Sequence, residues 1–131
     1  MDRRQCLTGI WHGLYSYPAA LEPVYFVATL LDAGSSLHGS THEAAIGRTG
    51  APLTVMASLV GGREGGTVHF LKTYDGTGDW RHAVAYAGAL SACGAEIEGQ
   101  WSIPGDWSGR FLMMRSAGAT EAAVRKVFEQ A

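Results

Sequence analysis

The chain has 131 residues, the length of one ordinary domain, and 47% of them are apolar, which excludes a disordered protein. Ten Lys and Arg nearly balance twelve Asp and Glu, leaving a net charge of −2. Because phosphate binding needs clustered basic residues, we expect neither nucleic acid nor an anionic membrane as a partner. Glycine is unusual at 18 residues, about twice the usual ~7%. Each glycine costs a helix about 1 kcal/mol, so strands and turns are favoured over helices.

The first residues of the chain are charged and polar and lack the apolar core of a secretory signal. No stretch reaches the ~18 apolar residues that a membrane helix needs. Cys6 and Cys93 are far apart, and in a reducing compartment they are expected to be free thiols. We therefore expect a cytoplasmic protein.

Eight apolar or alternating runs follow one another along the chain, separated by turn residues such as those at 34–36, 61–66 and 75–79. The runs are 7–17, 24–32, 37–44, 53–60, 67–74, 82–91, 95–102 and 108–116. Short strands at such regular spacing are typical of a sandwich or barrel. No linker or change in composition divides the chain. We therefore expect one domain over 1–131, with a barrel at 7–116 and a hairpin loop at 61–66.

The end of the chain differs from the rest, because Ala, Glu and Lys replace the β-branched runs. Thr120 is a candidate N-cap, and an apolar stripe at helical spacing follows it. The stripe consists of Ala123, Val124, Val127 and Phe128. This pattern predicts a short C-terminal α-helix over 119–130, packed on the barrel or on a neighbouring subunit.

Side chains of a strand alternate between its two faces, which predicts the inner face of most runs. In the run 95–102, for example, Glu98 and Gln100 alternate with Ile97 and Trp101, so the apolar pair is expected inside. The same rule places several hydrogen-bonding side chains inside: Tyr15, Tyr17, Glu43, Lys72, Tyr74, His82, Tyr86 and Arg115. A sealed core rarely collects so many, because each unpaired buried polar group costs about 1–3 kcal/mol. The second and fourth runs are apolar on both faces and cannot be oriented.

Small residues fall on both faces of the predicted barrel. Inward glycines are expected to permit strand coiling and to remove side-chain volume from the interior: Gly13, Gly39, Gly88 and Gly99. Alanines form an outward stripe on the run 82–91: Ala83, Ala85, Ala87 and Ala89. This stripe is flat and apolar and fits a homodimer contact, as does the expected terminal helix.

The opening Gly9-Ile10-Trp11 resembles the Gly-x-Trp start of the calycin barrels, which include lipocalins, fatty-acid-binding proteins and avidins. The resemblance implies an eight-stranded antiparallel up-and-down barrel, closed at one end by Trp11 with Arg115 of the last strand packed across it. The longer string Gly-x-Trp-x-Gly-x-Tyr-x-Tyr-Pro at 9–18 resembles a group of uncharacterised bacterial barrels. That group shares the segments 39–43, 70–75 and 99–101, and it carries no settled function. The start is also similar to the haem-binding nitrobindins, but 109–116 holds no His for haem, and no cofactor is expected.

A metal site is not expected from the histidines. His38 and His42 are four residues apart on one strand, about 13 Å, which is too far to share an ion. His42 and His69 are expected to face outward from different strands.

Glu43 and Lys72 are the more informative pair, because burying either one alone would be costly. They fit a structural polar cluster, a site for the polar end of a ligand, or catalysis with Glu43 as general base. We favour a small-molecule-binding barrel without assigning an enzyme activity. The expected ligand-binding residues are Tyr15, Tyr17, Glu43, Phe70, Lys72, Tyr74, Tyr86, Trp101 and Phe111. The alternatives are a small enzyme using the same pocket and a filled barrel acting as an interaction or structural module.

Overall fold

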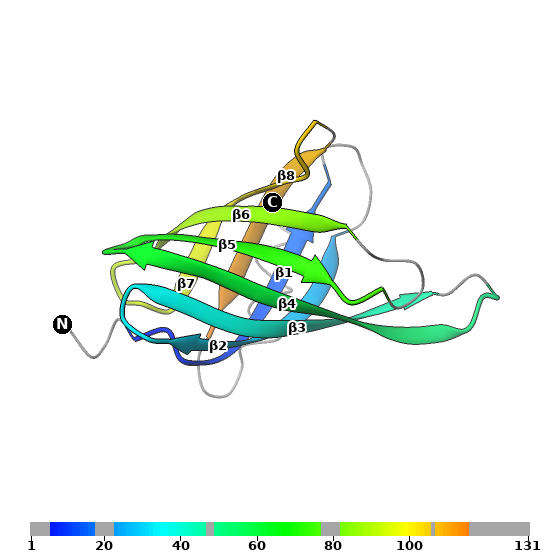
Figure 1. Ribbon diagram of the computed structural model, residues 1–131, viewed down its shortest axis with the longest axis horizontal. Helices are drawn as coiled ribbons and strands as arrows, with labels where there is room; N and C mark the ends of the chain where they lie inside the picture. The colour runs from blue at the N-terminus through cyan, green and yellow to red at the C-terminus, as the bar shows by residue number, and fades with distance from the viewer. Residues whose placement is uncertain (1–5, 18–22, 47–48, 77–81, 106, 116–131) are drawn as a thin grey trace.

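The computed structural model describes residues 6–17, 23–46, 49–76, 82–105 and 107–115. Eight antiparallel strands form a closed barrel in which each strand pairs with its neighbours in sequence and β8 pairs with β1 (Figure 1). The strands are β1 (Gly9–Ser16), β2 (Val24–Asp32), β3 (Ser36–Ile46), β4 (Pro52–Glu64), β5 (Thr67–Tyr74), β6 (Ala83–Leu90), β7 (Glu96–Ser102) and β8 (Ser108–Met114). Closure leaves no strand edge unpaired, which removes the usual site of edge-to-edge association.

The predicted eight-stranded barrel is confirmed, but the predicted fold class is wrong in adding a helix. Every regular element in the part of the chain that the structure describes is a strand, and residues 119–130 lie outside that part. The helix was inferred from one cap residue, Thr120, and a short apolar stripe. A segment of about 12 residues is only marginally helical by itself, so such a pattern does not determine a helix without tertiary contacts. The described residues also contain no helix long and apolar enough to cross a membrane.

The hairpin between β4 and β5 is tighter than predicted. β4 continues through Gly61 and Gly62 as far as Glu64, so that the expected loop at 61–66 reduces to a turn at Gly65 and Gly66. Gly65 has a φ of 59°, a left-handed conformation that glycine adopts without steric cost. Two of the four glycines of this segment, Gly61 and Gly62, therefore belong to a strand, and the other two form the turn.

Alternation along the strands sorts the side chains as the period of two requires. In β5 the buried residues are Val68, Phe70, Lys72 and Tyr74, and their neighbours are exposed. β2 and β4, which the sequence could not orient, turn Phe26, Ala28, Leu30, Val55, Ala57 and Leu59 inward. The alanines of β6 lie on the outer face, where Ala87 and Ala89 are exposed. The homodimer contact proposed for that face remains a prediction.

Leu7 and Trp11 plug one end of the barrel, and both are fully buried. The Trp11 indole Nε1 donates to the Leu7 carbonyl at 2.9 Å, which holds the N-terminal segment beneath the ring. The Arg115 guanidinium lies over the Trp11 ring at 4.7 Å from its centroid and donates from Nε to the Gly94 carbonyl at 3.2 Å. A cation over an indole face is attracted by the ring quadrupole, so this contact ties β8 to β1.

Asp32 also stabilises the closed end of the barrel. Its carboxylate accepts hydrogen bonds from the Leu7 and Gly34 backbone N–H groups and from Arg63 Nη1, each at 2.9 Å. Burial raises the pKa of Asp32, but these hydrogen bonds outweigh burial and lower the pKa below its ordinary value. The carboxylate therefore stays ionised and joins the N-terminal segment to β2 and β4.

Other groups of the protein occupy the positions where side chains of the inward glycines would lie. A Cβ on Gly13 would lie 2.2 Å from the Phe26 ring, so that ring already occupies the position of the missing side chain. A Cβ on Gly99 would lie 2.0 Å from the Ala87 carbonyl oxygen. Glycine at these positions allows rings and neighbouring strands to approach the backbone closely.

Substitution of Gly99 with alanine is predicted to destabilise the barrel. The new methyl group would overlap a backbone carbonyl on β6, and relieving such overpacking costs about 1–3 kcal/mol. Gly66→Ala is the matched control, because its Cβ would meet the Leu90 oxygen at an ordinary 3.8 Å. Urea denaturation should show a lower midpoint for Gly99→Ala and little change for Gly66→Ala. Equal stability of the two variants would contradict this account of the inner face.

Candidate functional site

The two ends of the barrel differ. Because the strands alternate in direction, β1, β3, β5 and β7 end, and β2, β4, β6 and β8 begin, at the end opposite the Trp11 plug. We call this the loop end. The β3–β4 ribbon extends beyond the neighbouring strands there, through the pairs Ala45 with Leu53 and Ile46 with Pro52 (Figure 1).

A buried carboxylate lies inside the barrel near the loop end. Glu43 on β3 accepts hydrogen bonds from the Tyr15 hydroxyl at 2.6 Å, Lys72 Nζ at 2.9 Å and the Tyr74 hydroxyl at 2.9 Å. The side chains of Glu43 and Lys72 are 1% and 0% exposed. Three donors from two strands, β1 and β5, thus surround one carboxylate on β3, and the ion pair is removed from water.

Aromatic rings surround the ammonium group of Lys72. Its Nζ lies 4.8 Å from the centroid of Phe26, 4.9 Å from Tyr74, 5.0 Å from Tyr15 and 5.6 Å from Tyr86. Ring faces stabilise a cation most strongly where water is absent. Lys72 therefore has one carboxylate partner, and the four rings replace much of its hydration shell.

An aromatic wall continues from Tyr86 away from the ion pair. Tyr86 stacks on Phe70 at 5.0 Å and meets Phe111 edge-on at 4.9 Å between ring centroids. Among the residues that the structure describes, the Tyr86 hydroxyl has no hydrogen-bond partner. The wall is thus apolar, with one unpaired phenolic donor beside the charged pair.

A second unpaired hydroxyl lies on β3. Thr41 is 1% exposed, and its Oγ1 has no partner within the described part of the chain. Its neighbours across β2 and β4 are Ala28 and Ala57, both small and buried. A buried hydroxyl without a partner is costly, and its place beside small side chains suits an additional polar atom there.

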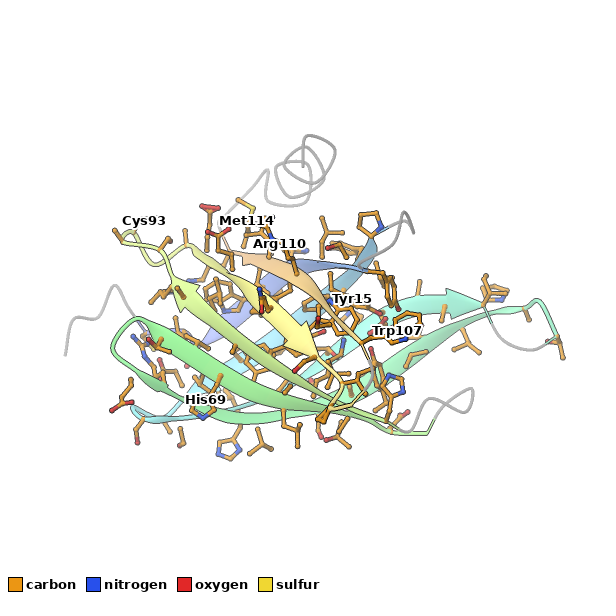
Figure 2. All side chains as sticks on the ribbon, turned by 90° about the horizontal axis from the view of Figure 1, so that it is seen from above. Tyr15, His69, Cys93, Trp107, Arg110 and Met114 are labelled. Atoms are coloured by element: carbon orange, nitrogen blue, oxygen red, sulfur yellow. The ribbon has the colours of Figure 1, made fainter. Side chains whose placement is uncertain are left out.

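The rim of the loop end is also aromatic. Tyr17 meets Trp101 and Trp107 edge-on, at 5.5 and 5.3 Å between centroids, and Trp107 is 46% exposed. Trp107 lies beyond Tyr15 toward this end in Figure 2. His82, which was expected inside, is exposed and packs against the Tyr74 ring at 4.8 Å. A chain of aromatic rings therefore runs from the rim to the buried network.

Burial raises the pKa of the Tyr15, Tyr74 and Tyr86 phenols above the ordinary value. The negative charge of Glu43 acts in the same direction on all three. The phenols therefore remain protonated and act as donors. For Lys72, burial lowers the pKa of the amine, and the neighbouring Glu43 opposes that shift.

The structure brings the nine predicted ligand-binding residues into one connected set: Tyr15, Tyr17, Glu43, Phe70, Lys72, Tyr74, Tyr86, Trp101 and Phe111. Whether they bind a ligand remains a prediction. Sequence reasoning missed Phe26, Thr41 and Trp107. Phe26 was missed because β2 is apolar on both faces, and the Thr41 hydroxyl because pairing cannot be read from one strand. Trp107 follows the turn at 103–105 and carries no strand alternation.

The histidines of β3 and β5 lie on the outside. His38, His42 and His69 are exposed, and Figure 2 shows His69 pointing away from the barrel. Within the described residues, no three potential metal ligands come together.

Comparison with known proteins supports the architecture alone. No protein-family model matches the chain, and no curated protein matches it. Among solved structures, a redesigned β-barrel superimposes with a TM-score of 0.64, covering 84% of this chain and 91% of that chain at 13% identity. At such low identity the likeness shows the barrel fold and carries no information about a ligand.

The three buried phenols predict how stability depends on alkaline pH. Their raised pKa values stabilise the folded state fully below the ordinary phenol pKa of about 10. That contribution is lost as pH rises further, because the unfolded chain releases protons that the native phenols keep. Ultraviolet absorbance of tyrosinate should therefore rise for Tyr15, Tyr74 and Tyr86 only together with unfolding seen by circular dichroism. Ionisation of all five tyrosines near pH 10 in a folded barrel would contradict this.

The ion pair predicts strong coupling between its two members. Glu43→Gln or Lys72→Met alone leaves a buried charge without its partner, which costs about 3–5 kcal/mol. The double variant should lose much less than the sum, because neither charge remains. Free energies of unfolding in urea measure this coupling. Additive losses would show that the two groups do not depend on each other.

Proposed function

We propose that the protein is a small-molecule-binding barrel that admits its ligand at the loop end. The polar group of the ligand lies against the network of Glu43, Lys72 and the tyrosines, and the aromatic wall covers its apolar part. The observation that carries the proposal is the buried ion pair, which lies near the end of the barrel opposite the plug.

The position of the charges supports binding over a purely structural role. Replacing a buried ion pair by apolar side chains of similar size is often neutral or stabilising, so stability alone does not explain it. At the closed end, Arg63 and Asp32 join β4 and β2 and anchor the N-terminal segment. Toward the loop end, Trp101 is buried and its indole Nε1 donates to the Ser16 carbonyl at 2.9 Å, so aromatic rings cover the network of Glu43 and Lys72.

The donors without a protein partner indicate which hydrogen-bonding groups the ligand carries. The hydroxyls of Tyr86 and Thr41 have no partners in the described part of the chain, and Lys72 uses one of its three N–H groups on Glu43. The free capacity of the site is thus mainly that of donors. A ligand with a hydrogen-bond acceptor and a planar apolar body fits it.

The proposal includes a calycin-like relationship for the barrel. It is supported by the Gly-x-Trp start at Gly9 and Trp11 and by the stacking of Arg115 on that indole. An eight-stranded barrel has an interior just wide enough to be filled by side chains or to hold one small ligand.

A filled barrel that acts as an interaction module is the second candidate. The close packing of Phe26 over Gly13 favours it, because that ring occupies interior volume. The remaining alternative, an enzyme with Glu43 as general base, is less favoured. All three hydrogen bonds to this carboxylate come from committed protein donors, which leaves it poorly placed to accept a substrate proton.

Native mass spectrometry of freshly purified protein tests the binding proposal. We expect a bound small molecule on the wild type that is reduced at least about tenfold in Tyr86→Phe, a loss near 1.4 kcal/mol. That hydroxyl has no described protein partner, so its removal should leave stability nearly unchanged. Tyr25→Phe is the control, because its hydroxyl contacts His12 on the outer face.

The opposite result is equally specific. A wild-type protein of bare mass, whose melting temperature no planar carbonyl or phenolic compound raises, would show a filled barrel. If Tyr86→Phe and Tyr25→Phe retained the bound molecule equally, the ligand would not bind at the buried network.

A further inference from the structure

The buried site around Lys72 combines a primary amine, a carboxylate and phenolic donors. The chain contains two lysines, Lys72 and Lys126, and Lys72 is the one within the described residues. Its Nζ lies 2.9 Å from Glu43 Oε1, and Glu43 accepts in turn from Tyr15 and Tyr74. A desolvated amine beside a proton acceptor is the arrangement in which lysine acts as a nucleophile.

We propose that Lys72 captures a planar aldehyde as a reversible imine, with Glu43 as counter-ion. This inference rests on the proposed binding function, because the aldehyde must enter at the loop end. It adds that the ligand is held by a covalent bond to Nζ.

The chemistry balances without an oxidant or a metal. The Lys72 ammonium gives one proton to Glu43, and the free Nζ electron pair then forms a bond to the aldehyde carbon. The carbonyl oxygen takes up two protons, the one passed to Glu43 and one from Nζ, and leaves as water, and a double bond forms between the carbon and Nζ. The product is a protonated imine beside the Glu43 carboxylate, so the net reaction is ammonium plus aldehyde to iminium plus water.

The same groups suit the intermediate and the product. The Tyr86 phenol, which burial keeps protonated, can donate to the carbonyl oxygen as negative charge develops on it. The carboxylate 2.9 Å from Nζ balances the positive charge of the iminium, as it balances the ammonium now. Burial also lowers the pKa of the Lys72 amine, which favours its nucleophilic form.

Charge and shape define the class of aldehyde. Glu43 would repel the charge of a carboxylate ligand, and Lys72 would repel the charge of an ammonium ligand. A neutral carbonyl compound therefore fits best. Four rings lie within 5.6 Å of Nζ, and the wall of Phe70, Tyr86 and Phe111 continues from them. These flat surfaces fit a conjugated or aromatic body better than a branched aliphatic one.

Reductive trapping with cinnamaldehyde tests the imine directly. Cyanoborohydride reduces an imine to a stable secondary amine, and trypsin no longer cleaves after an alkylated lysine. Modified Lys72 should therefore appear in the peptide 64–81, which joins two peptides that trypsin separates in the unmodified chain. We expect about tenfold or more modification of Lys72 over Lys126 in the native protein, and similar modification of both in urea.

Cinnamyl alcohol separates the imine from simple binding, because it has the same body without an aldehyde. If the alcohol raises the melting temperature and no adduct forms in 64–81, the imine is overturned while the binding function stands. If neither compound raises the melting temperature and no adduct forms, both proposals fail. An equal ratio of the two lysines in native protein and in urea would also overturn selective capture.

Two variants serve as further controls. Lys72→Arg keeps a cation beside Glu43 but cannot form an imine, so the adduct at this position should disappear in a variant whose circular dichroism shows a folded barrel. Glu43→Gln removes the counter-ion and should lower trapping at Lys72 by about tenfold or more. Unchanged trapping in a folded Glu43→Gln variant would exclude Glu43 from the reaction.

Discussion

Closure of β8 onto β1 is the constraint on which the rest of the structure depends. Once eight strands form a ring, every second side chain of each strand points into one small interior, and residues far apart in sequence must share it. Tyr15, Glu43 and Lys72 come from three different strands and meet only because the ring brings β1, β3 and β5 around a common axis. The alternating strand directions bring the ends of β1, β3, β5 and β7 together at the loop end.

The two charged clusters of the interior show what closure permits. Arg63 and Asp32 lie at the plugged end, where Asp32 also binds the N-terminal segment, so this pair has a structural task. Glu43 and Lys72 lie toward the other end among aromatic rings, on the same face of β3 as Thr41, whose hydroxyl has no partner in the described part of the chain. One end of the barrel thus carries an ion pair that anchors the N-terminal segment, and the other carries an ion pair surrounded by aromatic rings.

Alternation predicted much of the interior, because the period of two depends only on the strand itself. It placed Lys72 and Tyr86 inside correctly, and the exposed neighbours His69 and Ala87 outside. It failed where that signal is absent, as on β2, so Phe26 was not recognised as a ring beside Lys72. It also could not show that Phe26 fills the space over Gly13, since that contact depends on the register between β1 and β2.

The sequence by itself determined the number of strands, the inner face of most of them and the burial of Tyr15, Glu43, Lys72, Tyr74 and Tyr86, but not the exposure of His82 or the burial of Arg63. These follow from composition, turn residues and the period of two, all of which are local properties of the chain. Only the tertiary structure decided that Glu43 accepts from three donors, that Phe26 occupies the space over Gly13 and that Thr41 finds no partner among the described residues. Register and closure set these distances, and both arise from pairing between strands.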